Sequence, residues 1–206
     1  MSRMDYVIIC RVIELLNECG MTDEELSFLL GKANNYVFGF IAKPSDKNRF
    51  TEDQLDVLPY LLSCTFRQFI PNDTEPGDIH LYHTKRIDDD PKQVDNAYKG
   101  FSHIIYDATG KGTRIIWRKK KAAKGSFRKT NDTLLEMLTD WIHDGYFDTQ
   151  QTALEIYKKA RGDSRAGAFR VDELEKCLKT LCGSQFQALE KDSIDGLLRY
   201  WKRKRR

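Results

Sequence analysis

The sequence has no apolar run of the roughly 18 to 20 residues that cross a bilayer. Its first residues, MSRMDYVIIC, lead into polar, helix-like sequence without a small-residue cleavage site. It has five cysteines, an odd number, scattered along 206 residues and mostly placed among apolar neighbours. The thiols are therefore predicted to be buried and reduced. These absences argue against a membrane or a disulfide-stapled protein, and make a cytoplasmic location the default expectation.

Residue groups that could hold a metal or a phosphate are incomplete. His80-x-x-His83 has the spacing of two metal ligands, but no cysteine or carboxylate pattern beside it completes a zinc site. Gly110-Lys111-Gly112 is too short for a P-loop and lacks the Lys-Ser/Thr ending, so it is predicted to be a turn. The run Asp88-Asp89-Asp90-Pro91 is typical of an exposed loop or a helix entry. We therefore expect neither a metal nor a cofactor.

A nucleic-acid-processing enzyme is one alternative, built on His103 and Asp107, with neighbouring lysines holding the substrate. Metal-dependent nucleases need several converging carboxylates, whereas residues 108–131 contain neither Asp nor Glu. Because no nucleophile, base and orienting group can be assembled from the sequence, we predict that the protein is not an enzyme.

The charge is divided unevenly along the chain. Residues 1–78 contain 7 Lys and Arg against 13 Asp and Glu, and residues 79–206 contain 27 against 18. This polarity predicts two units with different surfaces, of which the second is the one to meet a polyanion. A content of 40% apolar and 11% aromatic residues is enough to build cores.

Four helices are predicted in the first third of the chain. The first covers residues 6–20 and ends at Gly20, and the second opens with the capping box Thr22-x-x-Glu25. The third runs from Ala33 to Lys43-Pro44, since proline disfavours helix in the residue before it. The fourth begins with a second capping box, Thr51-x-x-Gln54, and Pro59 predicts a kink or a break near Leu58.

This part of the chain, residues 7–70, resembles the helix-turn-helix core of the lambda-repressor-like family. The run GMTDEELSFLLGKANNYVFGFI, followed by a loop and EDQLDVLPYLLS, carries the resemblance, with matching positions at Gly20, Thr22, Glu25, Leu26, Gly31 and Val37. In that family the helix after the turn lies in the major groove and reads bases with its N-terminal residues. The resemblance implies that Asn34, Asn35 and Tyr36 are the readers, and asparagine suits adenine.

Two features depart from that family. The recognition helix has no Arg or Lys after Lys32, and the whole module is net acidic. Since phosphate neutralisation supplies most non-specific affinity for DNA, an acidic module is expected to bind DNA poorly by itself. The alternative is a helical bundle that uses this surface to hold a protein partner.

The middle of the chain is predicted to be a connector followed by a β-hairpin. Residues 73–98 mix prolines and acids around one short strand at 79–82. Two β-rich runs, 101–106 and 113–117, then flank a glycine turn. The predicted domains are therefore 1–72, the connector 73–98, and 99–206.

The last part of the chain, residues 131–203, has a weaker, winged-helix-like pattern in the order of its elements. Apolar stripes predict three helices, which stop at Gly145, Gly162 and Gly183. A hairpin around Asp195-Gly196 follows them. In a winged-helix domain the third helix would face the groove, and here it offers Arg170, Lys176 and Lys179. The alternative is a single α+β domain in which residues 197–201 form a C-terminal helix.

Basic residues gather after the first hairpin strand. The acid-free stretch 108–131 contains nine cations, with Trp117 and Phe127 among them. Such a stretch predicts a phosphate track, although a solvated basic loop has the same composition. Five further cations end the chain at 202–206. The nine are Lys111, Arg114, Arg118, Lys119, Lys120, Lys121, Lys124, Arg128 and Lys129.

These patterns predict a mainly α fold with a small β component (α+β), made of a helix-turn-helix bundle, a β-hairpin and a winged-helix-like domain. The predicted function is DNA-binding regulation, in which the basic module contacts phosphates of double-stranded DNA and the helix-turn-helix reads bases or dimerises. The alternative is a protein-interaction module of the antitoxin or immunity type, with a protein partner or a second copy and no membrane.

Overall fold

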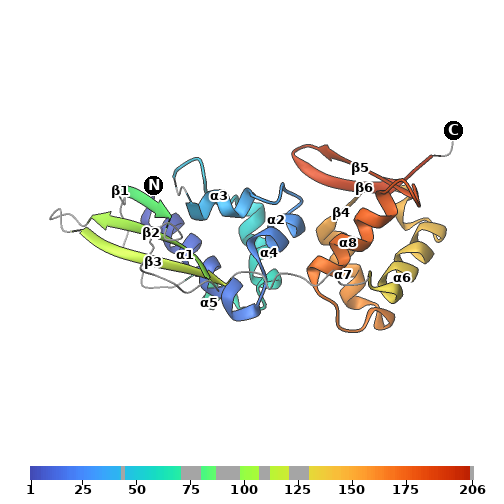
Figure 1. Ribbon diagram of the computed structural model, residues 1–206, viewed down its shortest axis with the longest axis horizontal. Coiled ribbons are helices and arrows are strands. Elements are labelled where there is room, and N and C mark those ends of the chain that lie inside the picture. Colours follow the sequence, from blue (N-terminus) through green and yellow to red (C-terminus); the bar gives the residue numbers. More distant parts are fainter. Residues whose placement is uncertain (43–44, 71–79, 87–97, 107–111, 121–129, 205–206) are drawn as a thin grey trace. The chain divides into compact units, whose positions relative to one another are not determined.

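The computed structural model describes residues 1–42, 45–70, 80–86, 98–106, 112–120 and 130–204, and in the strands between 80 and 120 it describes the backbone alone. The fold is mainly helical with small antiparallel sheets, as predicted (Figure 1). Its contacts divide the chain into two compact units. Unit 1 contains residues 1–23 and 35–125, and unit 2 contains residues 24–34 and 126–206.

Local signals mark both ends of the first helix of unit 1, whereas the third predicted helix begins at Tyr36 and not at Ala33. α1 (Arg3–Cys19) starts at Ser2, whose hydroxyl accepts a hydrogen bond from the Asp5 amide at 3.0 Å. It stops at Gly20, which has the left-handed φ of 71° that a C-terminal cap favours. α3 (Tyr36–Ala42), α4 (Glu52–Leu61) and α5 (Phe66–Phe69) follow. The core of these helices consists of Ile9, Val12, Leu16, Val37, Phe40, Leu58, Leu61 and Phe69.

α4 combines a confirmed prediction with a wrong one. The capping box of Thr51 and Gln54 is present at its start. The helix then continues through Pro59 to Leu61, so of the predicted kink or break near Leu58 the break is wrong. Proline removes one backbone donor, but the Leu62 amide again donates to the Leu58 carbonyl at 2.9 Å. A proline so close to the end of a helix interrupts little of its hydrogen bonding.

Unit 1 also contains a three-stranded antiparallel sheet in the order β1-β2-β3, which we call the basic sheet. β1 (His80–Arg86), β2 (Tyr98–Tyr106) and β3 (Gly112–Lys120) form it. The predicted hairpin is confirmed, with Phe101 opposite Trp117 and Tyr106 opposite Gly112. β3 contacts α1, so the sheet belongs to the same compact unit as the N-terminal helices.

Unit 2 has the order helix, strand, helix, helix and hairpin. α6 (Asp132–His143) begins at Asn131, whose side chain accepts from the Leu134 amide, and α7 (Ala153–Gly162) begins at a capping box of Thr152 and Glu155. α8 (Val171–Cys182) then precedes the hairpin of β5 (Leu189–Ile194) and β6 (Leu197–Lys202). Because residues 197–202 form a strand, the alternative of a C-terminal helix is wrong.

Two parts of unit 2 had no signal in the sequence. The two-residue strand β4 (Gln151–Thr152) pairs with β6 and gives a sheet in the order β4-β6-β5. Residues 24–34, which include most of α2 (Asp23–Leu29), group with the C-terminal residues in their contacts. The packed interior of residues 130–204 includes Leu134, Leu138, Phe147, Ile156, Leu174, Cys177, Leu178 and Leu181.

The cysteines are less buried than predicted. All five are free, but only Cys177 is buried, and Cys19 is exposed. The prediction failed because apolar neighbours in the sequence mark a helix without saying which of its faces a cysteine occupies. Burial raises the pKa of Cys177 to about 11 and that of Cys10 to about 12, so both thiols are protonated at neutral pH. Among the described residues, no helix is long and apolar enough to cross a membrane.

Two glycines of unit 1 should respond to alanine in opposite ways. A methyl group at either Gly20 or Gly39 would meet no atom within 4 Å, but Gly20 has a φ of 71° whereas Gly39 lies inside α3. We predict that Gly20→Ala lowers the free energy of unfolding by about 1 kcal/mol and that Gly39→Ala raises it by about 0.5–1 kcal/mol. Urea unfolding measures both. If the unfolding midpoints of the two variants moved in the same direction, the result would contradict the cap at Gly20 or the helical position of Gly39.

Candidate nucleic-acid interface

The three strands of the basic sheet contain no Asp or Glu. Their sequences, HLYHTKR, YKGFSHIIY and GTRIIWRKK, combine β-branched and aromatic residues, which favour strands, with cations. The strands themselves therefore supply no carboxylate to neutralise these cations. The seven cations are Lys85, Arg86, Lys99, Arg114, Arg118, Lys119 and Lys120.

The strand register divides these cations between the two faces of the sheet, with Lys99 and Lys119 sharing one face. Lys99 lies directly opposite Lys119, an arrangement of like charges that destabilises a sheet. Arg114, Arg118 and Lys120 occupy alternate positions of β3, and alternate positions share one face of a sheet. The fold thus places four predicted site residues on one strand, at a cost in charge repulsion that a bound polyanion would remove.

The three cations predicted for the third helix of unit 2 lie on one helix, α8: Arg170 is at its start, and Lys176 and Lys179 are within it. Each is paired with a carboxylate, however. Lys176 Nζ lies 3.1 Å from Asp172, and Lys179 Nζ lies 2.7 Å from Glu175. In both pairs the acid stands four residues before the base, the favourable order on a helix. Arg170 contacts Asp172 at 3.0 Å and Glu25 at 3.7 Å.

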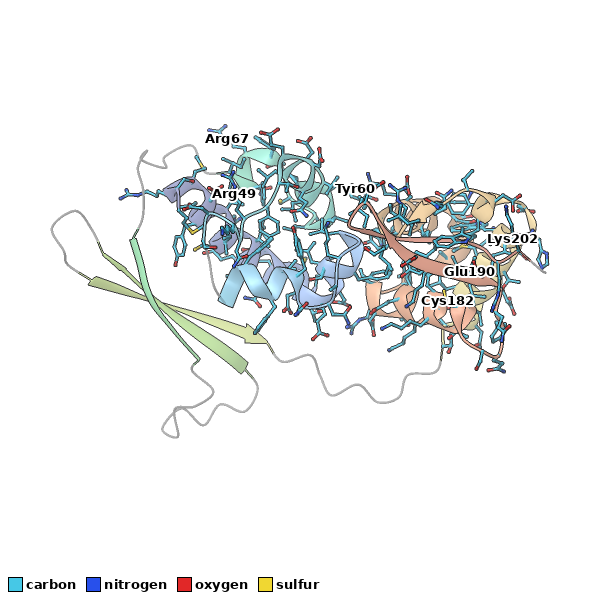
Figure 2. All side chains as sticks on the ribbon, turned by 90° about the horizontal axis from the view of Figure 1, so that it is seen from above. Arg49, Tyr60, Arg67, Cys182, Glu190 and Lys202 are labelled. Carbon is cyan, nitrogen blue, oxygen red and sulfur yellow. The ribbon has the colours of Figure 1, made fainter. Side chains whose placement is uncertain are left out.

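Other cations of unit 2 are paired in the same way. Arg165 lies 2.8 Å from Asp163 and 3.0 Å from Asp140, and the first contact lowers the pKa of Asp163 to about 2. Figure 2 labels Glu190 and Lys202 on the β5–β6 hairpin. Lys202 approaches Asp148 at 3.8 Å, and Arg203 approaches Glu190 at 3.4 Å. These contacts leave the described part of unit 2 with much of its positive charge compensated.

The positive charge of the second part of the chain therefore comes from the region of the basic sheet. Residues 79–129 contain 13 Lys and Arg against 5 Asp and Glu, whereas residues 130–206 contain 14 against 13. Counting residues 79–206 as one basic module concealed this difference. The same count in shorter windows would have separated a basic sheet region from a nearly neutral helical region.

The predicted base readers lie at the start of α3. Asn34 and Asn35 are exposed and directly precede the helix. Tyr36 is half-buried, and its hydroxyl accepts a hydrogen bond from Gln54 Nε2 at 3.0 Å, while its ring packs edge-on against Phe40. The asparagines are therefore accessible to a ligand, and Tyr36 has a structural role within unit 1.

Five predicted site residues, Lys111, Lys121, Lys124, Arg128 and Lys129, lie outside the described residues, as do Asp107 and the run 88–91. His80, His83 and His103 lie on strands of the basic sheet. Within the part of the chain whose side chains are described, no three His, Cys, Asp or Glu residues come close enough to hold a metal.

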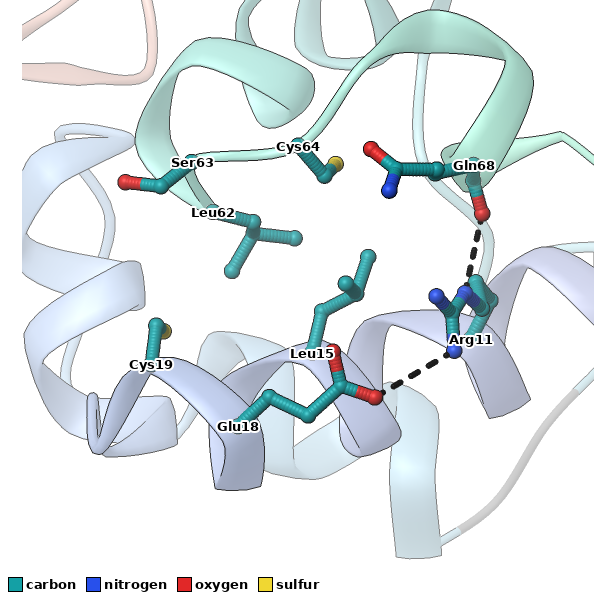
Figure 3. A pocket seen from close by; sticks show the side chains of 8 residues that line it. All are labelled: Arg11, Leu15, Glu18, Cys19, Leu62, Ser63, Cys64 and Gln68. Carbon is teal, nitrogen blue, oxygen red and sulfur yellow. Dashed lines mark hydrogen bonds and ion pairs between the residues drawn. The ribbon is translucent and has the colours of Figure 1, made fainter.

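A pocket of about 270 Å³ opens in unit 1 between α1 and the segment that joins α4 to α5 (Figure 3). Its main polar group, Arg11, is held by Glu14 at 2.8 Å and by the Gln68 carbonyl at 2.9 Å. Burial raises the pKa of the Cys64 thiol, which makes it a poor nucleophile at neutral pH. The pocket thus offers a small polar cavity without an activated group.

No protein family, curated protein or solved structure matches the chain. Its function is therefore argued from its own residues.

The pair of Asp163 and Arg165 gives a pH-dependent prediction. The folded pKa of Asp163 is about 2, below the value near 3.9 of an unfolded chain. Its contribution to stability is therefore present above about pH 4 and is lost as the pH falls through about 2. We predict that Asp163→Asn lowers the Tm at pH 7 by a few degrees, and that this difference narrows as the pH falls towards 2.

Thermal unfolding followed by circular dichroism measures this difference. Asp56→Asn is the control, because Asp56 is exposed on α4 and far in sequence from Arg165. If the Tm difference between the wild type and Asp163→Asn stayed constant between pH 7 and pH 2, it would contradict the ion pair of Asp163 with Arg165.

Proposed function

We propose that the chain is a non-enzymatic, DNA-binding regulatory protein that contacts DNA phosphates through the basic sheet. One observation carries the proposal: Lys99 stands opposite Lys119 on three strands that contain no Asp or Glu. Like charges held in register cost stability in the free protein. A phosphate backbone would turn this cost into affinity, because each neutralised phosphate releases condensed counterions.

The N-terminal helices support a role in base reading. Asn34 and Asn35 are exposed where α3 begins, and a recognition helix reads base edges with its N-terminal residues. An asparagine amide can bond both N6 and N7 of adenine. In this proposal the basic sheet supplies affinity, while the acidic helical module supplies selectivity or dimerisation.

The element order of unit 2 supports a winged-helix domain. Helix α6, strand β4, helices α7 and α8, and the hairpin β5–β6 follow one another, and the short strand β4 pairs beside β6. The ion pairs along α8 argue against this helix as the first phosphate-binding surface. We therefore assign the initial contact with DNA to the basic sheet and a secondary contact to unit 2.

A protein-interaction module of the antitoxin or immunity type is the second candidate, and the exposed side of α4 favours it. Glu52, Asp56 and Tyr60 follow at intervals of four residues, which places them on one side of the helix. All three are exposed, and Tyr60 retains 51% of its accessible surface. An acidic and aromatic surface of this kind suits a basic protein partner.

A salt titration of random-sequence duplex DNA tests the proposal. We predict that the affinity of the wild type falls steeply with salt, and that Lys99→Gln/Lys119→Gln weakens binding on the order of tenfold and reduces the slope of log K against log salt by about 2. The matched control is Lys176→Gln/Lys179→Gln, which removes two cations that are already paired on α8. Its affinity should stay within about threefold of wild type.

Two results would contradict the proposal. Equal losses of affinity in the sheet variant and in the α8 variant would show that the basic sheet is not the main DNA contact. Absence of duplex binding at low salt, together with a protein partner that stays bound at high salt, would favour the interaction module.

A further inference from the structure

Residues 24–34, which we call the clamp segment, hold the turn of the β5–β6 hairpin within unit 2. The Gly31 carbonyl accepts a hydrogen bond from the Leu198 amide at 2.8 Å. The next residue, Lys32, donates from Nζ to the Gly196 carbonyl at 2.6 Å. Two consecutive residues of the clamp segment thus bind the turn and the start of β6.

The clamp segment lies close to the hairpin backbone at Gly31. Its φ of 67° is one that side chains disfavour, and it ends α2 with the Lys32 amide donating to the Ser27 carbonyl. A Cβ at this position would lie 3.4 Å from the Leu198 nitrogen and 3.4 Å from a methyl carbon of Leu197. Glycine is therefore favoured both by the end of the helix and by the approach of the hairpin backbone.

The clamp segment also reaches the start of α8. Glu25 is only 6% exposed, and its carboxylate lies 3.7 Å from the guanidinium of Arg170. Arg170 is the N-cap residue of α8, and half of its side chain is exposed. It is one of the cations that the sequence predicted to meet DNA, and the carboxylate of Glu25 would compete with a phosphate oxygen for its guanidinium.

We propose that the clamp segment is an internal competitor for DNA, which withholds Arg170 and the tip of the β5–β6 hairpin until a duplex displaces it. The inference rests on the proposed function, in which unit 2 is a winged-helix domain. In such a domain the start of the recognition helix and the hairpin are the elements that meet the duplex. The clamp segment contacts both elements at once.

The buried apolar residues Leu26, Phe28 and Leu29 keep the clamp segment folded, whereas its polar contacts with Arg170 and the hairpin are of a strength that a duplex can overcome. A half-exposed ion pair is weak in water, and two hydrogen bonds can be exchanged for bonds to phosphate oxygens. A duplex that binds the released form more tightly than the clamped form shifts the population towards release. DNA gathered by the basic sheet would supply this duplex at high local concentration.

The first test needs no DNA. Hydrogen exchange of the Leu198 amide should be slow in the wild type and at least tenfold faster in both Gly31→Ala and Lys32→Met, because both variants remove part of the clamp. Gly20→Ala is the matched control, since its φ of 71° imposes the same backbone strain and its methyl group meets no atom within 4 Å. Unchanged exchange at Leu198 in Lys32→Met would overturn the clamp.

The second test is a mutant cycle with duplex DNA. Glu25→Gln should raise the affinity on the order of tenfold, a typical size for coupling between sites. Glu24→Gln, which removes the same charge from an exposed neighbour, should change it less than about twofold. Arg170→Gln should cancel the gain when it is combined with Glu25→Gln, and should have little effect in the wild type, where Arg170 is already occupied.

The outcomes separate the two proposals. The clamp would be overturned, and the proposed function left intact, if the wild type bound duplex DNA and Glu25→Gln did not raise its affinity. The same conclusion would follow if Arg170→Gln lowered the affinity equally in the wild type and in Glu25→Gln. Failure of both the wild type and Glu25→Gln to bind duplex at low salt would contradict the two proposals together.

Discussion

The repulsion between like charges on the basic sheet is the constraint on which this account depends. Several cations among the described side chains meet carboxylates at 2.7 to 3.8 Å, as at Lys179 with Glu175 and Lys202 with Asp148. The strands of the basic sheet hold seven cations and no acid, with Lys99 facing Lys119. A sheet that concentrates positive charge in this way is suited to an anionic partner.

In the proposed function, the basic sheet and unit 2 would have different roles. The basic sheet would attract a polyanion over the distance that screening allows, about 10 Å at moderate salt. Unit 2, nearly neutral over residues 130–206, would contribute little to that attraction. Its Arg170 is instead held between Asp172 and the buried Glu25. Exchange of one carboxylate for a phosphate would then couple the arrival of DNA to a change in unit 2.

Local signals predicted most of the secondary structure, because caps and turns depend on residues close in sequence. Gly20 ends α1, Thr51 with Gln54 begins α4, and Asp195-Gly196 turns the last hairpin, all as predicted. The contacts between residues of the candidate site were harder to predict from the sequence. The spacing of Asp172 before Lys176 could have indicated their pair, but nothing local joins Glu25 to Arg170, or Gly31 to Leu198. Those contacts depend on how distant segments pack.

Mapping of a random-sequence duplex by NMR chemical shifts tests the central claim most directly. The account predicts that the first and largest changes, at sub-stoichiometric DNA and low salt, fall on backbone amides of β2 and β3, and that amides of α6 and α7 stay unchanged. It would be contradicted if the early changes fell on α8 while the amides of residues 98–120 did not move. The acid-free sheet would then not be the surface that meets DNA.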